Sequence, residues 1–137
     1  MCYTWQKKVM TMKKIIQTKN APAPIGPFSQ ATVHGGTLYV SGQLPIDPGS
    51  GEVCGNDVRA QTKLVMENLL AIVEAAGATA EDVLKCTILL TNMGDFAAMN
   101  EVYGSFFPQN LPARICYEVC ALPKGAIVEV DAIVALR

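Results

Sequence analysis

The feature that most constrains the fold is a one-sided apolar pattern between residues 57 and 76. Apolar side chains recur there at the three-, four- and seven-residue intervals of one helix face, at Val58, Val65, Leu69, Ile72, Val73 and Ala76. Asn56 or Asp57 can cap this helix by accepting a backbone N–H of its first turn, and Gly77 can end it in a left-handed conformation. Because a helix with one apolar face must cover another layer, the sequence predicts a helix over Asp57–Ala76 packed on a sheet.

Short segments with strand character lie on both sides of this helix. The predicted strands are Lys14–Gln17, Ala31–His34, Leu38–Ser41, Val83–Leu90, Arg114–Cys120 and Ile127–Leu136. The Gly35-Gly36 dipeptide predicts a hairpin between the second and third of them. Val83–Leu90 is almost continuously apolar, which is typical of a strand covered on both faces. A six-residue turn containing Pro123 joins the last two strands, which we expect to pair as a hairpin.

A second helix is predicted over Asp95–Phe107, where Pro108 stops it. This order of elements predicts an α+β fold in which a single mixed β-sheet carries two helices on one face. No linker composition interrupts residues 12–137, which we expect to form one domain. Residues 1–11 are interpreted as a leader outside that domain, either dispensable or produced by an early start. The first twenty residues lack the apolar core and the small-residue cleavage site of a targeting signal.

The amino-acid composition and net charge limit the kinds of molecule that this protein is expected to bind. Of the 137 residues, 50% are hydrophobic and 17% are charged, which is enough apolar surface for a core and excludes a disordered chain. The net charge of −1 and the pI of about 5.8 give no general attraction to phosphate backbones or anionic lipid. We therefore expect neither nucleic acid nor a membrane as a partner.

The cysteines are widely spaced and form no C-x-x-C pair; they are Cys2, Cys54, Cys86, Cys116 and Cys120. The single histidine, His34, cannot complete a Cys/His zinc set with them. Four thiolates are sufficient in number for zinc, but their spacing favours reduced thiols that pack as small hydrophobes. Reduced cysteines are typical of the cytoplasm, where we expect this protein.

Alternation on the last two predicted strands sorts their side chains by face. Arg114 and Cys116 share one face of the first strand, and Glu129 and Asp131 lie opposite the apolar face of the second. If the hairpin pairs these polar faces, the four side chains form a surface on which Arg114 binds a carboxylate near a carboxylate base. The alternative is a solvated sheet face with weak surface ion pairs, and the pattern alone favours that alternative.

Longer motifs are more specific than this pattern. They are Ala23-Pro24-Ile25-Gly26-Pro27-Phe28-Ser29-Gln30, Ser41-Gly42-Gln43-Leu44-Pro45, Asn100, Pro112-Ala113-Arg114-Ile115-Cys116, and Leu122-Pro123-Lys124 followed by Glu129. With these motifs in this order, the chain resembles the reactive intermediate deaminase family (RidA, or YjgF/YER057c/UK114) over nearly all of Lys13–Arg137. The resemblance implies a chorismate-mutase-like fold and a homotrimer whose clefts lie between subunits, where Arg114 and Glu129 would line an interface pocket.

The resemblance also implies a reaction, the hydrolysis of 2-iminobutanoate and 2-iminopropanoate to 2-oxo acids and ammonia. These reactive imines and enamines leak from pyridoxal-phosphate enzymes such as threonine and serine dehydratases, so the role would be metabolite damage control. Arg114 would hold the substrate carboxylate in a bidentate fork. Glu129 would deprotonate a water for attack on the imine carbon and return the proton to the departing ammonia.

The substrate-binding residues that the resemblance implies are Arg114, Cys116, Ser41, Gly42, Asn100 and Phe28. Backbone groups near Cys116 and Ser41 would position the imine nitrogen. Neither a metal nor a cofactor is implied, because an iminium carbon is already electrophilic and positioning with one base suffices. Phe28 stands where the deaminases of the family usually have tyrosine, and the lost hydroxyl would be worth about 1 kcal/mol, or about fivefold in rate.

Two other functions remain open from the sequence. Phe28 is compatible with a metabolite-binding regulatory trimer that senses a 2-oxo acid or an amino acid in the Arg114 pocket without turnover. Ribonuclease activity has been attached to some relatives, but the chain has no cluster of basic and aromatic residues for binding phosphate and base.

Overall fold

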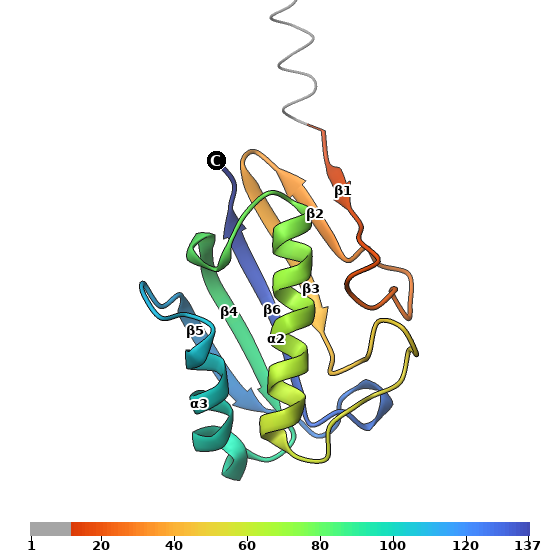
Figure 1. The fold of residues 1–137 in the computed structure, drawn as a ribbon, viewed down its shortest axis with the longest axis vertical. Coiled ribbons are helices and arrows are strands. Elements are labelled where there is room, and N and C mark those ends of the chain that lie inside the picture. Colours follow the sequence, from red (N-terminus) through yellow and green to blue (C-terminus); the bar gives the residue numbers. More distant parts are fainter. Residues whose placement is uncertain (1–11) are drawn as a thin grey trace, which may run out of the picture.

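The structure is a computed structural model that describes residues 12–137. Its strands are β1 (Lys14–Ile16), β2 (Ala31–His34), β3 (Thr37–Gln43), β4 (Val83–Leu90), β5 (Ala113–Glu118) and β6 (Val128–Ala135). Its helices are α2 (Val58–Ala75) and α3 (Phe96–Ser105), with 3-10 turns η1 (Ala80–Asp82), η2 (Met93–Asp95) and η3 (Pro123–Gly125). Figure 1 shows one sheet with both helices on the same face. The predicted α+β fold is confirmed, and the predicted leader at residues 1–11 lies outside the described residues.

The strands are ordered β1-β2-β3-β6-β4-β5, and only β4 and β5 run parallel. The predicted hairpin between β2 and β3 is present, with Gly35 and Gly36 at φ 58° and 81°. The predicted pairing of the last two strands is wrong, because β4 lies between β5 and β6. Helix α3 returns the chain over the sheet so that β5 adds parallel to β4 at the edge. Strand β6, with one face almost fully buried, takes a central place where both of its edges are paired.

The core lies between the helices and the sheet. It contains fully buried side chains from the predicted face of α2 and from alternating positions of β4 and β6, namely Val65, Leu69, Ile72, Val73, Cys86, Ile88, Leu90, Val128, Val130 and Val134. As predicted, Asp57 caps α2 by accepting the N–H of Ala60 at 2.9 Å, and Gly77 follows the helix at φ 85°. Truncating a fully buried residue such as Leu69 to alanine would cost about 2–5 kcal/mol.

The other face of the sheet is open in a single chain. Strand β4 was expected to be covered on both faces, but only its helix-facing residues are buried, and Leu84 is 52% exposed. The large apolar side chains on the open face are Ile15, Tyr39, Ile115, Tyr117 and Ile133. Several large exposed apolar side chains on one side of a sheet are more typical of an interface than of a solvated face, although Thr32 and Lys85 lie among them.

Two buried amides on α2 hold the loops at one end of the sheet. Asn68 donates to the carbonyls of Leu44 and Ile46 at 3.1 and 2.9 Å. Gln61 donates to the carbonyl of Gly55 at 3.1 Å and accepts the N–H of Ile127 at 3.0 Å. These bonds tie the loop between β3 and α2 to the helix, and the bond to Ile127 fixes the chain where it enters β6.

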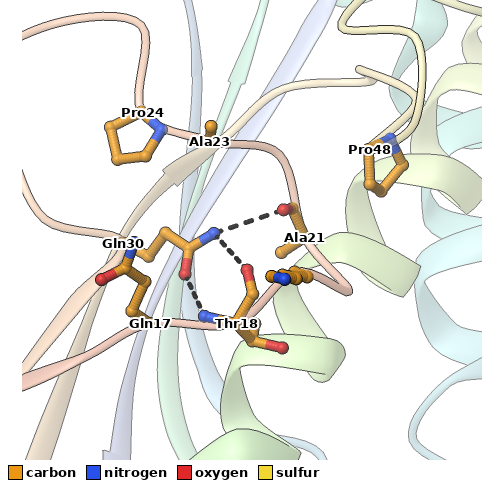
Figure 2. Close-up of a pocket in the computed structure, with 8 residues that line it drawn as sticks. Gln17, Thr18, Ala21, Ala23, Pro24, Gln30 and Pro48 are labelled. Atoms are coloured by element: carbon orange, nitrogen blue, oxygen red, sulfur yellow. Dashed lines mark hydrogen bonds between the residues drawn. The ribbon is translucent and has the colours of Figure 1, made fainter.

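A third buried amide, that of Gln30, anchors the N-terminal segment (Figure 2). It donates to the carbonyls of Thr18, Ala21 and Pro22 at 3.0, 3.3 and 2.9 Å, and it accepts the N–H of Thr18 at 2.7 Å. The same segment lines a groove of about 580 Å³ that reaches Pro48. Gln30 thereby fixes both ends of the proline-rich loop at residues 21–27.

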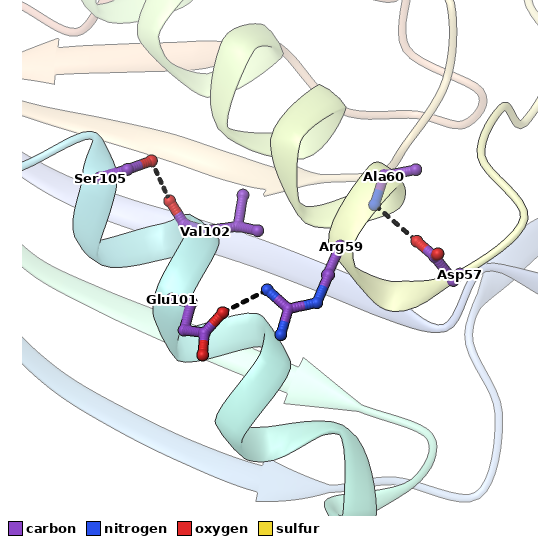
Figure 3. A network of polar contacts seen from close by, with 6 residues as sticks. All are labelled: Asp57, Arg59, Ala60, Glu101, Val102 and Ser105. Carbon is purple, nitrogen blue, oxygen red and sulfur yellow. Dashed lines mark hydrogen bonds and ion pairs between the residues drawn. The ribbon is translucent and has the colours of Figure 1, made fainter.

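The two helices are also joined on their outer surface, where Arg59 of α2 forms an ion pair with Glu101 of α3 (Figure 3). Both side chains are more than half exposed, so water and salt screen the pair. It therefore guides the packing of α3 only weakly. Within residues 12–137, no helix is long and apolar enough to cross a membrane.

Candidate active site

Arg114 lies on β5 and points to the face that the helices cover. Its partners come from α3: Nη1 donates to Oδ1 of Asn100 at 2.7 Å, and its Cζ lies 5.1 Å from the ring centre of Tyr103 and 5.4 Å from that of Phe96. Phe96 is 37% exposed and Tyr103 is buried, so the guanidinium sits at the rim of the core. A cation in this position can accept a carboxylate through its remaining N–H groups.

Glu129 lies on β6 and points to the open face. It lines a small hollow with Gly42, Thr87, Leu89 and Asp131. Burial raises the pKa of the Glu129 carboxyl, and the neighbouring charge of Asp131 raises that pKa further. A carboxylate with a raised pKa is a stronger base than an ordinary one, which suits proton abstraction from water.

Gly42 makes room for Glu129. A Cβ atom at residue 42 would lie 3.0 Å from both Cδ and Oε1 of Glu129, closer than such atoms normally approach. Asp131 is held separately, because its Oδ1 accepts the backbone N–H of Thr87 at 3.0 Å. Of the two neighbouring carboxylates, Glu129 is therefore the one free to act on a water or a ligand.

The prediction that Arg114 and Glu129 share one surface is wrong within a single chain. Arg114 is in register with Cys86 on β4, and Cys86 is in register with Ala132 on β6, so these three side chains share the helix-covered face. Glu129 is in register with Leu89 on the opposite face. The error follows from the assumed hairpin. Because β4 lies between β5 and β6, the side chains of these two strands are not matched directly, and the polar faces of β5 and β6 lie on opposite sides of the sheet.

The other residues expected at the site fall into the same two groups. Cys116 and Asn100 accompany Arg114, and burial raises the pKa of the Cys116 thiol although the charge of Arg114 opposes this. The second group surrounds Gly42, which lines one hollow with Glu129 and a neighbouring hollow with Phe28. Phe28 is 46% exposed and in turn borders a larger hollow of about 420 Å³ together with Ser41.

The hydroxyl of Ser41 is already committed within the chain. It donates to the carbonyl of Ser29 at 2.6 Å, while the backbone N–H of Ser41 donates to the carbonyl of Gln30 at 2.9 Å. Ser41 therefore ties β3 to the segment that carries Phe28. Its side chain therefore has a structural role in this group, and it is not placed as a nucleophile.

Phe96 and Tyr103 are residues beside Arg114 that the sequence analysis did not single out, because their helical spacing is also that of ordinary core packing. Together with Asn100 they stand at i, i+4 and i+7 of α3, which puts all three on one helix face. A polar residue between two aromatics on a core-facing stripe was the signal that could have found them. Within residues 12–137, no three His, Cys, Asp or Glu side chains converge as a metal ligand set.

The fold and these two groups define a class: an α+β protein with a guanidinium on one face of its sheet and a carboxyl group of raised pKa on the other. Comparison with known proteins agrees with this class. The family model described as endoribonuclease L-PSP matches residues 18–136. A RutC family protein of Pyrococcus horikoshii is 51% identical over 122 residues, which are 89% of this chain and 97% of that protein.

Two further relatives carry more informative descriptions. The 2-iminobutanoate/2-iminopropanoate deaminase of Rattus norvegicus is 45% identical over 122 residues, 89% of each chain. The crystal structure of E. coli TdcF with bound serine superposes with a TM-score of 0.87 at 42% identity, covering 90% of this chain and 99% of that one. The chain belongs to the endoribonuclease L-PSP family, which is the reactive intermediate deaminase (YjgF/RidA) family.

Proposed function

We propose that this protein is a homotrimeric deaminase that hydrolyses reactive 2-imino acids and their enamine tautomers, with 2-iminobutanoate and 2-iminopropanoate as substrates. The observation that carries the proposal is Arg114, a guanidinium held at the rim of the core by an amide and two aromatic rings, with no ion pair to any acid in residues 12–137. A cation fixed in this way is ready for a substrate carboxylate. The identity to mammalian deaminases of this specificity supports the same assignment.

In the proposed reaction, Arg114 binds the carboxylate of the imino acid through two parallel N–H bonds. Glu129 takes a proton from a water, and the water oxygen bonds to the imine carbon to give a tetrahedral carbinolamine. Glu129 then returns the proton to the nitrogen, which leaves as ammonia when the C–N bond breaks, while the carbinolamine hydroxyl gives its proton to Glu129 and becomes the carbonyl of the 2-oxo acid. This last proton passes to the ammonia, so the protonated imine and one water yield the 2-oxo acid and ammonium. Water is the second substrate, so the reaction has no net oxidation or reduction.

The substrate pocket is completed by the remaining residues of the two groups. Cys116 and Asn100 lie with Arg114, and backbone groups near Cys116 and Ser41 position the imine nitrogen. Gly42 keeps space for Glu129, and the ring of Phe28 forms an apolar wall. We place the reaction in the cytoplasm, where the reduced cysteines of this chain are stable.

A second copy of the chain is needed to bring Arg114 and Glu129 to one substrate, because one copy holds them on opposite faces of its sheet. The exposed apolar side chains of the open face supply the contact: Ile15, Tyr39, Ile115, Tyr117 and Ile133. Arg114 lies on the edge strand β5, where a neighbour packed against the open face can reach it. We infer a closed ring of three chains with one site at each interface.

A second candidate function is a regulatory trimer that binds a 2-oxo acid or an amino acid without turnover. Phe28 favours it, because a phenyl ring offers no hydroxyl to orient a substrate or a water. The serine bound to TdcF shows that a relative of this fold holds an amino acid. Both functions use the Arg114 cation, but only the deaminase needs Glu129 as a base.

Imine lifetime separates the two functions. Threonine dehydratase generates 2-iminobutanoate, semicarbazide traps what remains, and the protein is compared with its Arg114→Ala variant. The deaminase predicts that the wild type lowers the trapped imine and speeds release of the 2-oxo acid, whereas the variant does neither. An unchanged lifetime with intact binding of 2-oxobutanoate would favour the regulatory trimer.

A further inference from the structure

Arg114 is held by three side chains of α3, none of which carries a negative charge. Asn100 accepts one N–H of Nη1 at 2.7 Å, and the rings of Phe96 and Tyr103 lie 5.4 and 5.1 Å from the guanidinium carbon. The ring of Tyr103 is fixed in turn by Phe107, with ring centres 5.0 Å apart. The three contacts therefore come from one rigid helix face and restrict how the guanidinium can turn.

The strand residues next to Arg114 add no negative charge either; Glu118, four residues along β5, accepts the N–H of Met93 at 2.8 Å. Cys86 lies directly across from it on β4, and burial raises the pKa of that thiol to about 11. Cys116, two residues along β5, also has a raised pKa. Both thiols are therefore neutral at physiological pH. The hydroxyl of Tyr103 is buried without a hydrogen-bond partner in the described chain. Burial raises the pKa of this hydroxyl far above physiological pH, so Tyr103 is neutral as well.

The choice of partners matters because an arginine is most often fixed by a carboxylate, which cancels its charge. An aromatic ring attracts a cation through its quadrupole, and an amide oxygen accepts a hydrogen bond; neither neutralises the guanidinium. The guanidinium carbon lies over both rings, and within residues 12–137 the guanidinium N–H groups donate only to Asn100. Asn100 occupies a single donor, so enough parallel N–H groups remain for a bidentate carboxylate.

We propose that Phe96, Asn100 and Tyr103 are positioning residues that hold Arg114 as an uncompensated cation, and that they thereby give the site its affinity for carboxylate ligands. This inference rests on the proposed binding role of Arg114. It changes the expected role of Asn100, which acts on the arginine and not directly on the substrate. It also explains why an aromatic, an amide and a second aromatic share one face of α3.

The sharpest test is Asn100→Asp, because it keeps the shape and the acceptor oxygen but adds a charge beside Arg114. The matched control is Asn92→Asp, which makes the same charge change at the turn before α3 and keeps an acceptor for the N–H of Gly94. Calorimetry measures binding of 2-oxobutanoate, the proposed product, and thermal unfolding measures stability. KM and kcat for 2-iminobutanoate are measured in parallel.

For Asn100→Asp we expect binding of 2-oxobutanoate to weaken by about tenfold or more, while the melting temperature stays the same or rises, because a new ion pair forms. A merely structural role would instead make affinity and stability change in the same direction. Asn92→Asp should bind like the wild type. Wild-type affinity in Asn100→Asp would overturn the inference.

The aromatic contacts are tested by a conservative and a non-conservative change. Phe96→Leu and Tyr103→Leu should each raise KM and the dissociation constant about fivefold with little change in kcat, whereas Tyr103→Phe keeps the ring and should retain most of the affinity. Equal losses in Tyr103→Phe and Tyr103→Leu would contradict a role for the ring. A wild type that does not bind 2-oxobutanoate would also overturn the inference. Arg114-dependent binding without hydrolysis would overturn only the proposed deaminase.

Discussion

The surroundings of Arg114 and of Glu129 differ in almost every respect. Arg114 lies under α3, fixed between aromatic rings and an amide at the rim of the core. Glu129 lies on the uncovered face, in a small hollow that it shares with a second carboxylate, Asp131. Neither Arg114 nor Glu129 takes part in an ion pair within residues 12–137, so each charge lacks a partner of opposite sign there.

The difference teaches that one chain places these two groups on opposite faces of its sheet, which in the proposed function makes them two half-sites. The helix-covered half has a fixed geometry, because its contacts belong to the packed core. The open half has a tuned base, because burial and Asp131 raise the pKa of Glu129. In the proposed function, a carboxylate-bearing electrophile needs both halves, and we propose that a second chain covering the open face brings them together.

The largest expected effect comes from removing the cation. Arg114→Ala deletes two charge-assisted hydrogen bonds to the substrate, so kcat/KM for 2-iminobutanoate should fall by about 10²–10³-fold. Arg114→Lys should recover little of this, because an ammonium group does not reproduce the planar fork. The matched control is Arg59→Ala, which removes an exposed arginine from the outer surface of α2. Steady-state kinetics coupled to threonine dehydratase measure all three, and full activity in Arg114→Ala would remove this residue from the site.

Removing the base should reduce turnover but not binding. In Glu129→Gln we expect kcat to fall by about 10²-fold, with the affinity for 2-oxobutanoate within a fewfold of the wild type. Glu129 acts as a base only when it is ionised, and its pKa is raised. As the pH is lowered, wild-type kcat should therefore begin to fall at a pH above the usual pKa of a glutamate. Asp131→Asn removes a charge that raises this pKa, so the acidic limb of the pH–rate profile should move to lower pH. A limb that does not move would argue against Glu129 as the titrating group.

A smaller effect is expected where the backbone makes room for the base. Gly42→Ala puts a methyl group 3.0 Å from the carboxylate carbon of Glu129, so that side chain must shift, and kcat should fall about tenfold. The control is Gly104→Ala on α3, whose new methyl group would meet nothing within 4 Å. Measured kcat values that drop equally in both variants would show that the close approach at residue 42 is unimportant.

The smallest effect is expected at the half-exposed ring near the base. Phe28→Tyr restores a hydroxyl that the family's deaminases usually carry, and we expect kcat/KM to rise by about fivefold if that hydroxyl orients the substrate or the water. Because kcat/KM is expected to increase, a variant that merely folds less well could not produce the same result. Equal kinetics in the two proteins would assign the ring at residue 28 to packing alone.

The sequence predicted the parts of the fold that local chemistry dictates. Asp57 and Gly77 gave the ends of α2, the alternation from Val128 to Val134 gave the buried face of β6, and Gly35-Gly36 gave the first hairpin. It failed where strand order decides the outcome. The last two strands are adjacent in the sequence but separated in the sheet, because the pairing partner of an edge strand depends on the packing of α3 and not on its own residues.

The candidate site shows the same division. Arg114 and Glu129 were singled out by their residue types and motifs, but their relative placement was not predicted, since one misplaced strand exchanges the faces. Phe96 and Tyr103 were not singled out, because an aromatic on a helical stripe has the same pattern whether it packs on an aliphatic side chain or on a guanidinium. Only the tertiary structure distinguishes these two partners.

The central claim, that each site takes Arg114 from one chain and Glu129 from another, is tested most directly by mixing two inactive variants. Arg114→Ala and Glu129→Gln are unfolded together, refolded at equal amounts, and compared with each variant refolded alone. In random trimers about one quarter of the interfaces would pair an intact arginine with an intact glutamate, so about a quarter of wild-type activity should return. A mixture that stays as inactive as its parents, although size-exclusion chromatography with light scattering shows mixed trimers, would contradict the account.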